Sequence, residues 1–286
     1  MTKRVGIIAI ALMAQCDAGP AQRSCSASGT PGCGLIAIPS GTFTMGEDPS
    51  TGARDAAPVQ PNISVSAFSI DAYEVTVGRF RAFWNAGHPA PASPIRYPGG
   101  SIAWNGPVTE PASSDPNCNW PSARSDDHPI NCVDWETAQA FCVWDGGRLP
   151  TAAEWEFAAR GTDGRSFAWG SSAPDDAHAC RSSGDGTCAI GTHLAGDSAF
   201  GVHDMTGNVR EWNADWYEPY TDTGCWGGVA RADPLCTTPS ADPSLNGHVV
   251  PGGSWVNHLE LQWMHSATRY WGVAAYVPGE GFRCAR

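Results

Sequence analysis

The stretch that decides the fold is NCVDWETAQAFCVWDGGRLPTAAEWEFAARG, residues 131–161, which predicts two short helices separated by a pair of glycines. In its first half, apolar side chains recur at helical spacing after Asp134, a residue type that caps helix N-termini. Gly146 and Gly147 then interrupt this pattern. The first helix is therefore expected between Asp134 and Gly146.

The second half of this stretch carries a capping box. Thr151 can accept from backbone amides of the first turn while Glu154 reaches back to the cap, and Pro150 lies just outside. Gly161 is a C-terminal stop of the usual kind. A second helix is expected from about residue 152 to residue 160.

Outside this stretch the composition favours irregular backbone. The 286 residues include 33 Gly, 23 Pro and 13 Trp, so turns held by aromatic packing should outweigh long regular ladders. Ile36 to Met45 holds two apolar runs around Pro39-Ser40-Gly41, which predicts a hairpin there. Thr76 can cap a further helix that carries Phe80 and Phe83. An irregular α+β domain is expected.

The charge of the chain limits its partners. Its 17 basic and 29 acidic side chains give a formal net charge of −12, which repels nucleic acid backbones and is compatible with cations. No nucleic acid partner is expected.

The N-terminus predicts export. Basic residues at 3 and 4 precede an apolar run from Val5 to about Ala14, which is too short to span a membrane, so residues 1–19 are expected to be a signal peptide. Cys16 lies in a loose lipoprotein processing pattern and offers a lipid anchor as the alternative to simple cleavage. Residues 20–34 are small, polar and rich in glycine, and are expected to form an exposed linker. The protein is expected outside the cytoplasm, either secreted or periplasmic.

Cysteine usage supports this location. Ten of the eleven cysteines remain when Cys16 is set aside, and an exported chain of this kind is expected to form disulfides. The sequence does not determine which cysteines pair with each other. Proximity favours Cys25 with Cys33, Cys118 with Cys132, Cys180 with Cys188, and Cys225 with Cys236.

A set of ordered motifs resembles the formylglycine-generating enzyme, or sulfatase-modifying factor, family. The resemblance covers about residues 35 to 286 and rests on these segments: FTMG at 43–46, DGGRLPT at 145–151, EWE at 154–156, FAWG at 167–170, GNVREW at 207–212, GGSW at 252–255 and GFRC at 281–284. It implies a C-type-lectin-like fold over a single domain, residues 35–286. It also implies a bridge between Cys142 and Cys284.

The resemblance further implies a structural calcium site. Side-chain oxygens at its ends and backbone carbonyls between them would converge on the ion, a donor set that calcium prefers. The matching residues are Asp204, Gly207, Val209 and Glu211. The resemblance also implies a second calcium site, but one of its ligand positions falls at His178, a poor calcium ligand. Asp185 is the candidate that would partly replace this ligand.

The oxidases of this family hold copper(I) between two cysteines five positions apart after the Gly-Gly-Ser turn, because thiolates suit this soft ion. In this chain the two positions fall near Asn257 and Gln262, and there is no cysteine between Cys236 and Cys284. Copper binding is therefore not expected. His258 and His265 lie beside these positions, but two imidazoles alone define no known copper site.

The expected function follows from two features of the family cleft: its lining residues are present, and its copper cysteines are absent. Its residues are Ser254, Trp255, Asn257, His258 and Arg269. We expect an exported family domain that is not a copper oxidase and that binds a peptide or other ligand in this cleft. The alternative is a protein-modifying oxidoreductase that acts through a different site.

Overall fold

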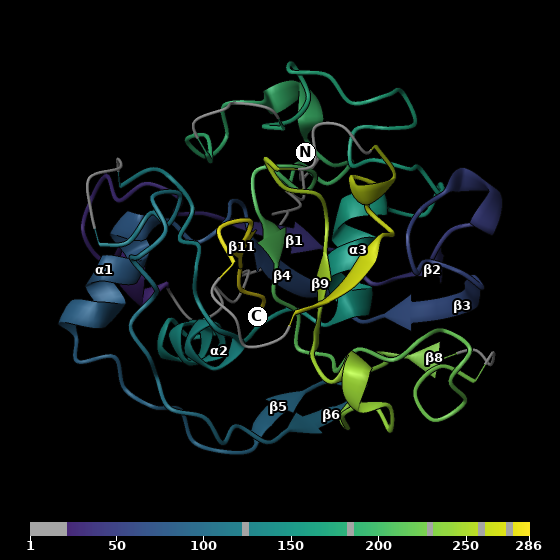
Figure 1. Cartoon of the computed structure of the whole chain (residues 1–286), viewed down its shortest axis with the longest axis horizontal. Coiled ribbons are helices and arrows are strands. Elements are labelled where there is room, and N and C mark those ends of the chain that lie inside the picture. The colour runs from purple at the N-terminus through teal and green to yellow at the C-terminus, as the bar shows by residue number, and fades with distance from the viewer. Residues whose placement is uncertain (1–21, 122–125, 182–185, 228–230, 257–260, 273–276) are drawn as a thin grey trace, which may run out of the picture.

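The computed structural model describes residues 22–121, 126–181, 186–227, 231–256, 261–272 and 277–286 (Figure 1). Its α-helices are α1 (Val77–Asn85), α2 (Trp135–Trp144) and α3 (Ala152–Arg160). Its strands are short: β1 (Leu35–Ile38), β2 (Gly41–Met45), β3 (Gln60–Val65), β4 (Phe68–Asp71), β5 (Ile95–Tyr97), β6 (Gly100–Ile102), β7 (Arg210–Glu211), β8 (Arg231–Ala232), β9 (His248–Pro251), β10 (Arg269–Gly272) and β11 (Glu280–Gly281). The irregular α+β class is confirmed.

The predicted helix caps are confirmed. The Asp134 side chain accepts from the Thr137 amide at the start of α2, and Thr76 accepts from the Arg79 amide at the start of α1. Thr151 and Glu154 form the complete capping box of α3. These helices begin where the sequence predicts because the caps satisfy amides that the first turn leaves unpaired.

The predicted hairpin at residues 39–41 is wrong. β1 pairs with β4 and β2 with β3, both antiparallel, and the register continues from Ile38 opposite Phe68 to Gly41 opposite Val65. Residues 35–45 therefore form one bent ribbon with residues 60–71, and Pro39 lies at the bend, where it needs no amide partner. The chain reverses further on, in the connection of residues 46–59.

The core lies around the central helices. α3 packs against β2, β3 and β9 on one side, and α1 packs against α2 on the other (Figure 1). Two apolar clusters follow this division, one centred on Trp155 and Phe157 of α3 and one on Phe80 and Phe141 of α1 and α2. In the part of the chain that the structure describes, no helix is long and apolar enough to cross a membrane.

All five expected disulfides form. Four close short loops, as proximity predicts: Cys25–Cys33, Cys118–Cys132, Cys180–Cys188 and Cys225–Cys236. The fifth joins Cys142 of α2 to Cys284, 142 positions later. This bridge ties the central helix to the last segment of the chain.

Residues 22–34, the described part of the expected exposed linker, are exposed in some places and docked onto the domain in others. Ser24 is buried, and its amide donates to Asp145 Oδ1 at 2.6 Å. The buried guanidinium of Arg79 donates to Ser24 Oγ at 2.9 Å and to the Gly32 carbonyl at 3.1 Å. The segment is docked because it supplies acceptors that a buried arginine requires. Residues 1–21, with the predicted signal peptide and Cys16, lie outside the described residues.

Candidate functional site

A pocket of about 560 Å³ lies where the 46–59 connection meets the segment after the Gly-Gly-Ser turn. The connection supplies Thr51, Gly52 and Arg54, and the later segment supplies Leu261, Gln262, Trp263 and His265. Leu261–Trp263 forms a 3-10 turn, and the Gln262 carbonyl accepts from Thr268 Oγ1 at 2.8 Å. The structure therefore places Gln262, one of the two residues expected near the family's copper-binding cysteines, on the wall of this pocket. The other, Asn257, and the adjacent His258 lie outside the described residues.

A buried ion-pair chain supports one wall of the pocket. His265 Nδ1 lies 2.8 Å from Glu47 Oε2, and Glu47 Oε1 lies 3.3 Å from Arg160 Nη2. Arg160 also pairs with Glu156, whose pKa is raised by burial. These ion pairs hold the His265 ring in place, and the ring packs against Phe167 with ring centroids 4.8 Å apart. Sequence reasoning missed Glu47 and Arg160, because 218 positions separate Glu47 from His265.

The donor set of this pocket does not fit copper(I). The family site requires two thiolates, whereas every cysteine between residues 22 and 286 belongs to a disulfide. Gln262 offers a neutral amide in place of one thiolate. No step of a mechanism can therefore be assigned to copper held by this pair of positions.

The Gly-Gly-Ser turn lies beside the predicted calcium loop. The Trp255 amide donates to the Asn208 carbonyl at 2.9 Å, and Trp255 Nε1 donates to the Pro278 carbonyl at 3.3 Å. Gly252 has a φ of 81° and packs so closely against the Trp155 ring that a Cβ would lie 3.3 Å from it. Ser254 is fully buried. The Gly-Gly-Ser turn therefore packs against the core, and Trp255, the residue that follows it, is partly exposed.

Arg269, expected in the cleft, lies in the core. It is 2% exposed, and its Nη1 donates to the Glu218 carbonyl at 2.9 Å. Its guanidinium lies 4.1 Å from the Tyr220 ring centroid and about equally far, 5.0 and 5.1 Å, from those of Tyr217 and Trp226. Cation–π contacts of this kind stabilise a buried cation. Arg269 is therefore not among the residues that line the pocket, although its amide donates to the carbonyl of the lining residue Arg54 at 3.0 Å.

The region of the predicted calcium residues holds three buried carboxylates, those of Asp204, Glu211 and Glu74. Glu211 accepts from Arg283 at 2.8 and 2.7 Å and from Trp155 Nε1 at 2.8 Å. Glu74 accepts from the Val209 amide at 3.1 Å, and its pKa is raised well above the usual range by burial and then by the negative charges of Asp204 and Glu211.

Asp204, the first of the predicted calcium residues, accepts from the Gly191 amide at 2.6 Å, and burial raises its pKa. Gly207 has a φ of 95°, and a Cβ there would lie 2.8 Å from the Cys180 carbonyl, so only glycine fits. A calcium ion held here would share Glu211 with Arg283. Within the described residues no group of three or more His, Cys, Asp or Glu side chains has metal-site geometry. Calcium binding stays a prediction.

We expect calcium at this loop to stabilise the folded protein. Saturating calcium should raise the melting temperature by about 5 °C or more over the chelated protein, because a ligand that binds only the folded state stabilises it. Differential scanning calorimetry with calcium and with chelator measures this difference, and Asp204→Asn should reduce it. Magnesium at the same concentration is the control. Equal melting temperatures in calcium and in chelator would contradict the site.

At the position of the second family calcium site, the described residue is His178. His178 Nδ1 lies 2.6 Å from Asp175 Oδ1, so this histidine already has a carboxylate partner. Asp185 lies outside the described residues.

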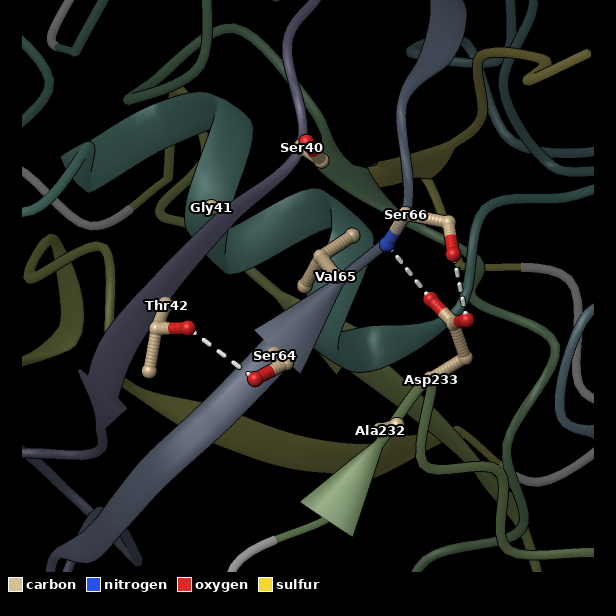
Figure 2. Close-up of a pocket in the computed structure, with 8 residues that line it drawn as sticks. All are labelled: Ser40, Gly41, Thr42, Ser64, Val65, Ser66, Ala232 and Asp233. Carbon is tan, nitrogen blue, oxygen red and sulfur yellow. Dashed lines mark hydrogen bonds between the residues drawn. The ribbon is translucent and has the colours of Figure 1, made fainter.

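A second pocket lies between β2, β3 and β8, and its polar side chains hydrogen-bond to one another. Figure 2 shows Thr42 and Ser64 facing each other across it, with hydroxyl oxygens 3.0 Å apart. Ser66 donates to both oxygens of Asp233, from its amide at 2.7 Å and from its hydroxyl at 2.6 Å. These bonds hold β8 against the bend of the ribbon, so we assign this second pocket a structural role.

Comparison with known proteins agrees with this fold. The family described as "Sulfatase-modifying factor enzyme 1-like domain" matches residues 22–286. The formylglycine-generating enzyme of Thermomonospora curvata is 32% identical over 79% of this chain and 83% of the relative. The bovine protein named "Inactive C-alpha-formylglycine-generating enzyme 2" is 29% identical over 88% of this chain and 87% of its own length.

Among solved structures, PvdO from Pseudomonas aeruginosa is similar in fold. Its TM-score is 0.63, at 23% identity, over 90% of this chain and 96% of PvdO. The family match, which extends to residue 22, includes the docked N-terminal segment as well as the 35–286 region. The chain therefore belongs to the sulfatase-modifying factor family, whose members include formylglycine-generating enzymes and relatives named inactive.

Proposed function

We propose that this chain is an exported sulfatase-modifying-factor domain that does not oxidise thiols through copper and instead binds a peptide or similar ligand in the pocket beside Gln262. One observation carries the proposal: the pocket is present, but the chain has no cysteine between Cys236 and Cys284, and the expected positions of the family's two copper cysteines fall near Asn257 and Gln262. The existence of a related protein named inactive supports this reading.

Export is part of the same proposal. Five disulfides in one domain are typical of proteins from oxidising compartments, and the apolar leader and Cys16 provide a signal peptide or a lipid anchor. Labelling with a radioactive fatty acid, followed by Cys16→Ser, separates the two routes. Labelled protein that persists after Cys16→Ser would rule out anchoring at this cysteine.

The alternative, an oxidoreductase that acts through a different site, draws on His265. Its imidazole lies on the same pocket as Gln262, and imidazole suits copper or iron. One described imidazole does not make a metal site, so we place this reading second.

We expect no stoichiometric copper(I) binding and no conversion of a cysteine-containing sulfatase-type peptide to formylglycine, because neutral amides bind this soft ion poorly. Copper titration and mass spectrometry of the peptide under oxygen and reductant check both points. The matched comparison is the double variant Asn257→Cys with Gln262→Cys, which restores the family's donor set.

Loss of the thiol with gain of an aldehyde in the unmodified protein would overturn the non-oxidase proposal. If that product disappeared in the double variant His258→Ala with His265→Ala, the alternative would be established.

A further inference from the structure

The pocket beside Gln262 is lined by hydrogen-bond donors and carries no carboxylate among its described residues. Arg54, Gln262 and His265 can all donate into it, and Leu261 and Trp263 supply apolar surface. This is contrary to the composition of the chain, which has 29 acidic and only 17 basic side chains. The lining is that of a site for an anionic group next to an apolar one.

His265 is positioned to donate. Its Nδ1 is held by Glu47 at 2.8 Å, and Glu47 is in turn balanced by Arg160. Its Nε2 makes no hydrogen bond within the part of the chain that the structure describes. The side chain is 12% exposed, and His265 is one of the residues that line the pocket. The imidazole pairs with Glu47, which Arg160 contacts in turn, and it packs against the Phe167 ring.

Arg54 lies on the pocket wall, and its ion pair is an exposed one. Its guanidinium lies 4.3 Å from the Trp263 ring centroid, and its backbone carbonyl accepts from the Arg269 amide at 3.0 Å. Its ion-pair partner is Asp55 at 3.2 Å, with the two side chains 40% and 37% exposed. Ion pairs this exposed contribute little free energy, so a ligand can replace Asp55 at modest cost.

We propose that the pocket binds a peptide carboxylate between the His265 imidazole and the Arg54 guanidinium, with the neighbouring apolar side chain of the ligand against Leu261 and Trp263. This rests on the proposed ligand-binding function and names its ligand class. The carboxylate belongs either to the C-terminus of a peptide or to an Asp or Glu side chain. Both present the same planar pair of acceptors to a guanidinium.

Three probes separate these sources: acetyl-Ala-Leu with a free carboxylate, the same peptide with a C-terminal amide, and acetyl-Glu-Leu-amide. Isothermal titration on the intact, disulfide-bonded protein at pH 5.5 should show that a carboxylate probe binds about tenfold or more tighter than the amide, since hydrogen bonds to charged groups exceed neutral ones. Tighter binding of the first probe assigns a C-terminus, and tighter binding of the third assigns an acidic side chain.

His265→Asn should weaken binding of the carboxylate probe at pH 5.5, because it removes the imidazole from the pocket wall. Arg54→Gln should weaken the carboxylate probe and leave the amide probe unchanged.

The chain offers matched controls for both donors. His203 pairs with Asp197 at 2.7 Å away from the pocket, and Arg81 pairs with Asp126 at 3.1 Å and lies 5.2 Å from the Trp120 ring centroid. His203→Asn and Arg81→Gln should leave probe affinity unchanged.

Equal affinity of acid and amide probes, or full binding by His265→Asn at pH 5.5, would overturn the carboxylate assignment and leave peptide binding standing. Formylglycine production in the assay above would instead overturn the proposed function. Failure of all three probes to bind would overturn the carboxylate assignment.

Discussion

Replacing Cys142 and Cys284 together by alanine is expected to lower the free energy of unfolding by about 5 kcal/mol in the chain-entropy model. The bridge spans 142 positions, so its loss releases nearly half of the unfolded chain from a constraint. Both cysteines are fully buried, and the bridge joins α2 to the segment that pairs with Arg148 and Ser69. Urea unfolding followed by tryptophan fluorescence measures the change.

The matched control is the double alanine variant of Cys180 and Cys188, which are only 8 positions apart. The same model gives about 2.5 kcal/mol for a loop of that length. If the two double variants unfolded at the same urea concentration, the loop-length argument would fail. Non-reducing peptide mapping that found Cys142 free would refute the bridge itself.

Replacing Arg79 by methionine is expected to lower the free energy of unfolding by about 3–5 kcal/mol, because it removes one of the two arginines that pair with the same buried carboxylates. Arg79 is fully buried on α1 and pairs with Asp71 at 2.9 Å and Asp145 at 2.8 Å. It also holds Ser24 and the Gly32 carbonyl. The variant should therefore release the N-terminal segment as well as destabilise the core.

Two measurements check this expectation. Chemical unfolding gives the stability change, and limited proteolysis should cleave the variant within residues 22–34. Arg286 also pairs with Asp71 and Asp145, each at 2.7 Å, and keeps part of the charge balance. Arg81→Met is the control on the same helix, because its pair with Asp126 is exposed and should be worth less than about 1 kcal/mol. A loss for Arg79→Met no larger than for Arg81→Met would contradict the role of this arginine.

The calcium loop shows how far residue types alone can predict a site. The resemblance assigns Asp204, Gly207, Val209 and Glu211 to one calcium site, whereas the structure shows the Asp204 carboxylate on the Gly191 amide and the Val209 amide on Glu74. It also shows Arg283 on Glu211. These partners come from other segments, so no spacing within residues 204–211 could have indicated them.

The sequence by itself determined what depends on neighbouring residues. The helix at 135–144 and the capping box at 151–154 follow from side chains within one turn of the backbone they cap. The four short disulfides follow from proximity along the chain. The absence of any cysteine between Cys236 and Cys284 is likewise a property of the sequence.

Only the tertiary structure decided which distant groups share one environment. It docked residues 22–34 onto Arg79, placed Arg269 in an aromatic cage, and paired Glu47 with His265 across 218 positions. In each case a buried charge needs a partner, because leaving it unpaired costs more than ordering a distant segment to meet it. That requirement acts through space, and the order of residues along the chain does not reveal which partner meets it.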